Sequence, residues 1–99
     1  MSNPTVIAVV VAWNRAQLLR ETLDGLALQT RPLDGVVVVD NASSDETPQL
    51  IASHPVVTNV VTLPQNYGGA GGFAAGIARA MTLGADLVWI MDDDTIPTP

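Results

Sequence analysis

Apolar and polar positions alternate in blocks along this chain, and the blocks predict strands and helices in turn. Four short apolar runs have the length of buried strands, and the first is almost continuously β-branched. These runs cover Val6–Ala12, Val36–Val39, Asn59–Leu63 and Leu87–Met91. The segments between them carry apolar residues three and four positions apart, as amphipathic helices do. The pattern predicts the order βαβαβαβ, which is an α/β fold with a mostly parallel sheet, right-handed crossovers and helices on both faces.

Each predicted helix has an apolar stripe or a boundary signal of its own. In the first helix, over residues 15–28, the stripe consists of Leu19, Leu23 and Leu26. The second helix is short, because Pro48 is tolerated only in a first turn and Pro55 follows soon after. The third helix ends near Gly84, a residue type common just past a helix end. Its predicted buried stripe consists of Ala74, Ile77, Ala78 and Met81.

The composition limits the chain to a single small domain and disfavours several classes of partner. Ninety-nine residues with 47% apolar and only 14% charged residues have few charges for a surface in water, so we expect part of a larger domain. A net charge of -6, from ten acids and four arginines, argues against nucleic acid and against anionic lipid. The absence of cysteine excludes disulfides and thiolate metal sites.

The termini carry no targeting signal that the sequence makes recognisable. No basic segment precedes the first apolar run, and no small-residue cleavage site follows it. We expect a cytoplasmic location, with attachment to the inner face of the membrane left to parts not present here. A sheet that stopped at the fourth strand would expose an edge and an apolar face, so either further chain covers them or the molecule self-associates.

Polar residues follow the first, second and fourth predicted strands at the point where each strand ends. They are Asn14 and Arg15, Asp40 and Asn41, and Asp92 to Asp94. The carboxyl ends of parallel strands lie at one edge of a sheet, where open α/β folds bind ligands. We therefore expect these side chains to converge on one crevice. A carboxylate such as Asp40 could accept hydrogen bonds there from a ribose or a base.

The three consecutive acids after the fourth strand are candidates for binding a cation. Adjacent carboxylates repel one another, and in an extended chain Asp92 and Asp94 point to the same side while Asp93 points to the other. Two carboxylates on one side can share a hard divalent ion. The alternative is a solvated acidic turn after a strand.

A glycine-rich block, residues 68–72, opens the third predicted helix. Glycines there let backbone N–H groups approach a phosphate or sugar at the positive helix end, although they could equally serve close helix packing. Residues 69–74 also match the dinucleotide fingerprint G-x-G-x-x-A, so an NAD(P)-binding Rossmann domain is an alternative function. That fingerprint requires a tight turn directly after a strand, and residues 64–67 intervene.

The position of Trp13 allows two interpretations. It follows the first strand at the crevice edge, where it could stack on a base or serve only packing.

A phosphoacceptor module of the receiver type is a further alternative, because such modules also gather acids at strand ends. Receiver domains place an acid pair after the first strand, whereas this chain has Asn14 and Arg15 there.

Four segments taken together resemble the family 2 glycosyltransferases, in the same order and over nearly the whole chain. They are residues 9–15, 39–47, 66–73 and 91–94. The Asn-x-Gly-Gly-x-Gly-Gly block with a triple Asp is most similar to the galactofuranosyltransferase and rhamnosyltransferase-like branch. The resemblance implies a Rossmann-like GT-A fold, a UDP- or dTDP-sugar donor, a glycan or lipid-linked acceptor, and a role in cell wall polysaccharide biosynthesis. It also implies a Mg²⁺ or Mn²⁺ cofactor.

By the same resemblance, site roles can be assigned to individual positions. Asp92 and Asp94 would hold the metal, Asp40 the nucleobase, and Asp93 the donor ribose or sugar. The other positions implied to border the nucleotide sugar are Ala12, Trp13, Asn14, Arg15, Asn66, Gly68, Gly69, Gly71 and Gly72. The base of an inverting transfer would lie beyond Pro99. Residues 1–99 would then be the donor-binding N-terminal part of one GT-A domain, inactive alone.

Overall fold

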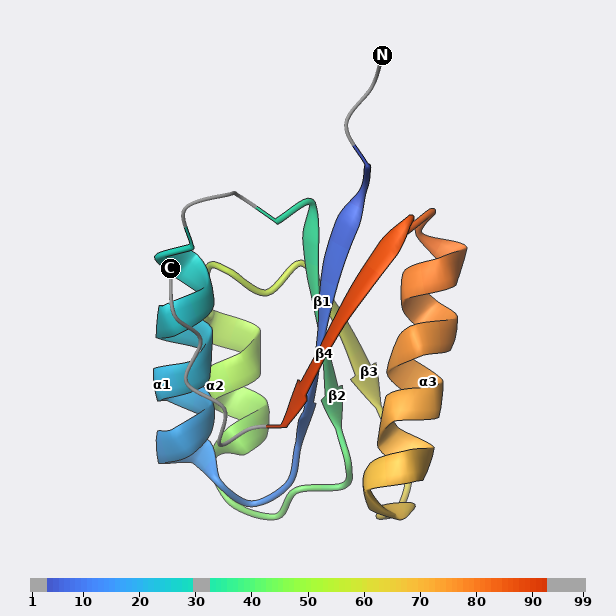
Figure 1. Ribbon diagram of the computed structural model, residues 1–99. Coiled ribbons are helices and arrows are strands. Elements are labelled where there is room, and N and C mark those ends of the chain that lie inside the picture. The colour runs from blue at the N-terminus through green and yellow to red at the C-terminus, as the bar shows by residue number, and fades with distance from the viewer. Residues whose placement is uncertain (1–3, 30–32, 93–99) are drawn as a thin grey trace.

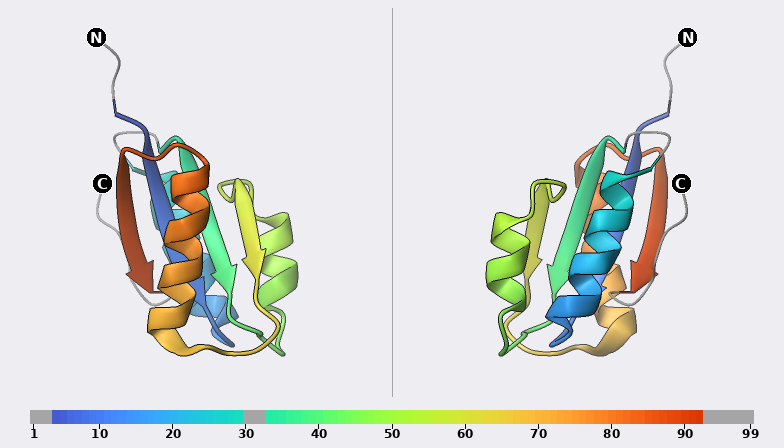
Figure 2. Two further views of the ribbon diagram at one scale, coloured as in Figure 1. Left: turned by 90° about the vertical axis from the view of Figure 1, so that its right-hand side faces the viewer. Right: turned by 90° about the vertical axis from the view of Figure 1, so that its left-hand side faces the viewer.

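A four-stranded parallel sheet in the order β3-β2-β1-β4 forms the centre of the computed structural model, which describes residues 4–29 and 33–92 (Figure 1). The strands are β1 (Val6–Ala12), β2 (Gly35–Asp40), β3 (Asn59–Thr62) and β4 (Leu87–Asp92). The helices are α1 (Ala16–Ala27), α2 (Thr47–Ser53) and α3 (Gly68–Thr82). Helices α1 and α2 cover one face of the sheet and α3 covers the other (Figure 2). The predicted α/β class and element order are confirmed.

The two central strands carry most of the core. Every residue of β2 is buried, and in β1 all residues after Val6 are buried. A continuous β-branched run suits this position, because helices cover both faces of the strand. The predicted stripe of α1 is confirmed, since Leu19, Leu23 and Leu26 pack on the sheet. Among the described residues, no helix is long and apolar enough to cross a membrane.

The prediction that β4 is covered on both faces is wrong for the described part of the chain. Within Leu87–Met91 only Met91 is buried, and Leu87 and Ile90 are 55% and 46% exposed. Strand β4 lies at the end of the sheet and pairs with β1 alone. An apolar run gives the preference for a strand but not its place in the sheet, and here that place is the edge.

The buried face predicted for α3 is also wrong. The residues that α3 buries are Gly72, Gly76 and Ala80, whereas Met81 is 61% exposed and Ala74 and Ala78 are exposed. A Cβ atom on Gly76 would lie 2.3 Å from Cγ1 of Val9. Helix α3 therefore rests its backbone directly on the valines of the sheet, with Phe73 partly buried beside them and Met81 exposed. The predicted end is confirmed, because Gly84 follows the helix with a φ of 85°.

Candidate functional site

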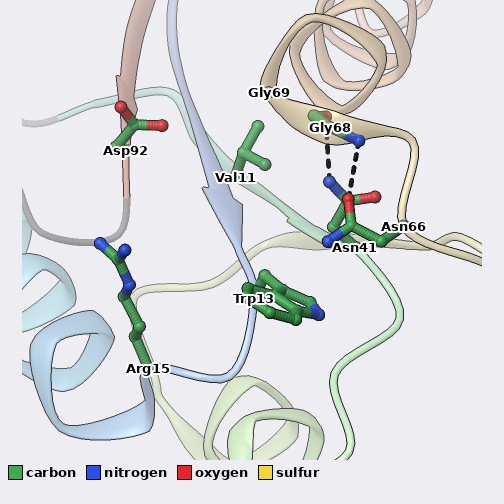
Figure 3. A pocket seen from close by; sticks show the side chains of 8 residues that line it. All are labelled: Val11, Trp13, Arg15, Asn41, Asn66, Gly68, Gly69 and Asp92. Atoms are coloured by element: carbon green, nitrogen blue, oxygen red, sulfur yellow. Dashed lines mark hydrogen bonds between the residues drawn. The ribbon is translucent and has the colours of Figure 1, made fainter.

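A pocket of about 260 Å³ opens at the carboxyl end of the sheet, beside the start of α3 (Figure 3). It is lined by Val11, Trp13, Arg15, Asn41, Asn66, Gly68, Gly69 and Asp92. The register of the sheet brings the ends of three strands together, because Val11 pairs with Asp92 and Ala12 pairs with Asp40. Of the strand-end residues predicted to converge, Arg15, Asn41 and Asp92 line this pocket, whereas Asn14 and Asp40 do not.

Two opposite charges lie on one side of this pocket, and a helix start lies on the other. Figure 3 places the side chains of Arg15 and Asp92 on the side away from Gly68 and Gly69. Asp92 is the last residue of β4 and is exposed. The first backbone N–H groups of an α-helix have no partner within the helix, and they carry its positive end. The pocket thus offers a guanidinium, helix N–H groups and a carboxylate, a set that suits an anion together with a cation.

An aromatic ring contributes the apolar part of the pocket. Trp13 directly follows β1 and is 46% exposed, so much of its indole is accessible from the pocket. Val11 presents its side chain next to it. A flat ligand group, such as a base, could stack on the indole.

Two asparagine side chains hold the turn before α3. Asn41 is 2% exposed, and its carboxamide forms two hydrogen bonds with the turn. Its Nδ2 donates to the Gly68 carbonyl at 3.0 Å, and its Oδ1 accepts from the Tyr67 N–H at 2.9 Å. Asn66 Oδ1 accepts from the Gly68 N–H at 2.7 Å. Gly68 has a φ of 77°, a conformation that glycine adopts without strain. Gly69 follows, and a Cβ atom there would meet nothing within 4 Å.

Asn14 has a structural role that its predicted ligand contact did not include. Its Oδ1 accepts from the backbone N–H groups of Ser44 at 2.7 Å and Asp45 at 3.3 Å, and its own N–H donates to Ser43 Oγ at 3.0 Å. It lies outside the pocket lining and ties the loop after β1 to the loop after β2. Its φ of 48° is rare for a residue with a side chain.

The other predicted site residues are placed as follows. Asp40 is 3% exposed, its Oδ1 accepts from the Ser43 N–H at 3.0 Å, and it does not line the pocket. Ala12 is fully buried. A Cβ atom on Gly71 would lie 2.6 Å from Tyr67 Cβ, and one on Gly72 would lie 2.6 Å from Val11 Cγ1. These two glycines serve close packing in this structure.

Of the three consecutive acids predicted to form a metal site, only the first is among the described residues. Asp92 lines the pocket, whereas Asp93 and Asp94 lie outside the described residues. Within residues 4–29 and 33–92, no three histidines, cysteines or acids gather as a metal site would require. Asp92 has the oxygen donor that a hard divalent ion prefers, and its exposure leaves that donor accessible.

The starts of α1 and α2 lie close to this edge of the sheet and share one acid. The Thr47 hydroxyl, together with the backbone N–H groups of Thr47 and Ala16, holds the pKa of the Asp45 carboxyl below its usual range. The Thr47 N–H donates to Asp45 Oδ1 at 2.9 Å. Asp45 is thus ionised at neutral pH and stabilises the two helix starts.

Asn41 and Val11 line the pocket although no ligand role was predicted for them. A signal for Asn41 exists in the sequence, because it is a polar residue directly after a buried strand, like its neighbour Asp40. Val11 gives no such signal. In the sequence it is one of several apolar residues of β1 and looks like an ordinary core residue.

The alternative of a dinucleotide fingerprint does not fit the geometry. The fingerprint requires a tight turn directly from a strand into a helix. Here residues 63–67 separate β3 from α3, and β3 lies at the edge of the sheet.

Comparison with known proteins agrees with this geometry. Residues 7–99 match the sequence profile described as Glycosyl transferase family 2. The galactofuranosyltransferase GlfT1 of Mycolicibacterium smegmatis is 42% identical over 92 residues, which are 93% of this chain and 30% of the relative. GlfT1 of Mycobacterium tuberculosis H37Rv is 45% identical and is covered to the same 30%, with 91% of this chain aligned. The chain thus spans just under a third of these curated relatives.

Solved structures show the same arrangement of elements. The mannosyltransferase PcManGT from Pyrobaculum calidifontis, in complex with GDP-Man and Mn²⁺, superposes with a TM-score of 0.80 at 32% identity, over 94% of this chain and 28% of the other. Residues 1–349 of TarS from S. aureus, in complex with UDP-GlcNAc, give a TM-score of 0.79 at 27% identity, over 91% and 26%.

Proposed function

Because this chain belongs to glycosyltransferase family 2, we propose that it is the donor-binding part of an enzyme that transfers a sugar from a nucleotide-diphosphate sugar. The observation that carries the proposal is the pocket at the carboxyl end of the sheet, where Arg15, Asp92 and the start of α3 come together. The complexes of PcManGT with GDP-Man and of TarS with UDP-GlcNAc support a donor of this class. An acidic chain needs such a local arrangement of cationic groups to hold a diphosphate.

Each lining group has a role toward the donor. The Arg15 guanidinium pairs with diphosphate charge, because it lines the pocket and its planar fork of donors matches phosphate oxygens. Gly68 and Gly69 border the diphosphate and the sugar, since glycine leaves the backbone open to close approach. The Trp13 indole stacks on the base. Asp93 contacts the ribose or sugar, as the family resemblance implies. The base contact implied for Asp40 would require its carboxylate to leave the Ser43 N–H, because Asp40 is buried and lies outside the pocket lining.

A divalent ion completes the site in this proposal, held by Asp92 and Asp94. The Mn²⁺ in the PcManGT complex supports a divalent ion, Mg²⁺ or Mn²⁺, at this place. When bound, such an ion supplies Lewis-acid stabilisation to the departing diphosphate. The chain's own contribution is to hold the diphosphate between Arg15 and the start of α3.

The acceptor side lies outside this chain in our proposal. We place the base that deprotonates the acceptor hydroxyl beyond Pro99, so the chain alone binds a donor without transferring its sugar. The acceptor is a glycan or a lipid-linked acceptor of cell wall polysaccharide synthesis, and the base of the donor is uracil or thymine. Exposed β4 offers a surface through which an isolated chain self-associates.

Titration of UDP into the chain, with Mn²⁺ and with EDTA, tests the proposal. We expect measurable binding in Mn²⁺ and a loss of about tenfold or more in EDTA, which removes the ion, or in Asp92→Asn, which removes a protein ligand of the ion. Asp86→Asn is the matched control. It makes the same charge change just before β4, at the opposite end of that strand, where Asp86 Oδ2 accepts from the Thr5 N–H at 2.7 Å. Equal affinity in Mn²⁺ and EDTA would refute the metal, and no UDP binding at all would refute the donor site.

A further inference from the structure

Asn41 has the most buried polar side chain of the pocket, and its hydrogen bonds join separate elements. It directly follows β2, and its backbone N–H donates to the Ala12 carbonyl at the end of β1 at 2.9 Å. Its carboxamide reaches across to Tyr67 and Gly68 at the start of α3. One residue thereby links the ends of two strands and the first residue of a helix (Figure 3).

Tyr67 stands at the N-cap position of α3, and its side chain makes no capping hydrogen bond. Asn66, in the same loop, accepts from the Gly68 N–H, whereas Asn41 reaches the entry of the helix from a neighbouring strand. Asn41 bonds the Tyr67 N–H and the Gly68 carbonyl, so it fixes both the entry and the first residue of the helix from a neighbouring strand.

The packing of α3 on β1 limits how far its first turns stand from the sheet. A Cβ atom on Gly72 would lie 2.6 Å from Val11 Cγ1, which is too close, and 3.5 Å from Asn41 Nδ2, which is an ordinary contact. Glycine at this position lets the first turns of α3 lie against β1 and beside the amide. Val11 therefore limits the height of the helix start above the sheet, and the hydrogen bonds of Asn41 hold the turn that enters the helix.

We propose that Asn41 is a positioning residue for donor recognition: its carboxamide sets where the start of α3, with the N–H of Gly69, stands relative to Arg15 and Asp92. This inference rests on the proposed donor site. A diphosphate that spans the pocket contacts the Arg15 side and the α3 side at once, so a shift of α3 weakens its binding. A monophosphate reaches less of the pocket and depends less on that spacing.

The test compares UDP and UMP binding, in Mn²⁺, to the wild-type chain and to Asn41→Ala. We expect the UDP affinity to fall about tenfold and the UMP affinity to change by less than about threefold. Amide hydrogen exchange should become faster at Tyr67 to Gly69, with α1 unchanged. Asn41→Ser, whose side chain is too short to reach both partners, should show the same pattern if the alanine variant folds poorly.

Thr58→Ala serves as the matched control, since it also removes a side chain with two hydrogen bonds to backbone. Thr58 Oγ1 accepts from the Val36 N–H at 2.9 Å and donates to the Val36 carbonyl at 3.3 Å, at the opposite end of β2. The control should lower thermal stability and leave the ratio of UDP to UMP affinity unchanged.

Two results would overturn the inference: an equal loss of UDP and UMP affinity in Asn41→Ala, or unchanged exchange at Tyr67 to Gly69. Failure of the donor site itself gives a different result. In that case the wild-type chain binds neither nucleotide, and the exchange measurement alone decides whether Asn41 holds the helix start.

Discussion

At the scale of single residues, asparagine side chains form hydrogen bonds that join the loops at the carboxyl end of the sheet. Asn14 binds the loop after β2, Asn41 binds the start of α3, and Asn66 binds the Gly68 N–H. An amide suits this role because it carries a donor and an acceptor without a charge. Backbone N–H and carbonyl groups of the loops thereby find hydrogen-bond partners without secondary structure.

Replacing Asn14 should separate its side-chain contribution from its backbone strain. Asn14→Ala removes the acceptor for the Ser44 and Asp45 N–H groups and keeps a Cβ atom at a φ of 48°. We expect a loss of about 2 to 3 kcal/mol in the free energy of unfolding, measured with urea. Asn14→Gly should lose about 1 kcal/mol less, since glycine adopts positive φ freely. Equal losses in both variants would contradict the strain.

The Asp45 carboxylate should make stability depend on acid pH. Its pKa is lowered in the folded chain by the Thr47 hydroxyl and by the N–H groups of Thr47 and Ala16. Folding therefore favours the ionised form: the stabilisation is complete above the unfolded pKa of about 3.9 and is lost as the pH falls through the lower folded pKa. The difference in unfolding free energy between wild type and Asp45→Asn should shrink over that window. If the difference in unfolding free energy stays constant from neutral pH to below this window, Asp45 does not contribute through its ionised form.

At the scale of elements, helix α3 packs closely on the sheet because the residues of its buried face are small. Gly72, Gly76 and Ala80 lie one helical turn apart, and their small size brings the helix axis close to β1 and β2. The start of this closely packed helix borders the pocket through Gly68 and Gly69. Larger residues on that face would raise the helix and widen the pocket.

Substitution of the α3 glycines tests this packing. Gly76→Ala gains about 1 kcal/mol of helix propensity, but its Cβ would lie 2.3 Å from Val9 Cγ1 and 2.9 Å from Val39 Cγ2. Overpacking of this kind costs about 1 to 3 kcal/mol, so we expect a net fall in Tm. Gly69→Ala, in the same helix with open space around the added methyl, should leave Tm unchanged or raise it. A Gly76→Ala variant as stable as wild type would show that α3 can lift at no cost.

The elements themselves could be predicted from the sequence, whereas some of their faces could not. Strand and helix periods gave the order of the seven elements, and the stripe of α1 was right because leucines mark it. The buried face of α3 was predicted wrongly, because a hydropathy pattern scores glycine as neutral and follows Met81 instead. The role of Asn41 could not be predicted either. An amide after a strand equally suits a turn, and its partners are 26 and 27 residues away.

At the scale of the whole molecule, the candidate site depends on the sheet as a unit. Six of the predicted ligand residues line the pocket, namely Trp13, Arg15, Asn66, Gly68, Gly69 and Asp92. Parallel strand ends converge by topology, so Trp13, Arg15 and Asp92 could be predicted from the order of the elements. Asn66, Gly68 and Gly69 were predicted instead from the glycine-rich block and the family resemblance. Whether a side chain beside the pocket turns into it depends on local hydrogen bonds. Asp40 and Asn14 turn toward the loop after β2 instead.

The exposed edge of the sheet should govern the oligomeric state of the isolated chain. Leu87 and Ile90 of β4 are about half exposed on a strand whose outer edge pairs with no described residue. We expect concentration-dependent association in sedimentation velocity, and its reduction in Ile90→Lys, because a charge on an edge strand opposes pairing. Leu18→Lys makes the same change on exposed α1 and should leave association unchanged. A wild-type chain that stays monomeric at all concentrations would refute self-association through β4.

The asparagine hydrogen bonds that join the loops after β1 and β2 and the start of α3 also bear on the rate at which a ligand leaves. A rim already held by Asn14, Asn41 and Asn66 has little loop entropy left to lose when a ligand arrives. Encounter rates then vary little among related ligands, and their affinities differ through dissociation. Substrate selection at such a rim becomes a matter of residence time: a poorly matched donor enters as readily as a good one and departs sooner.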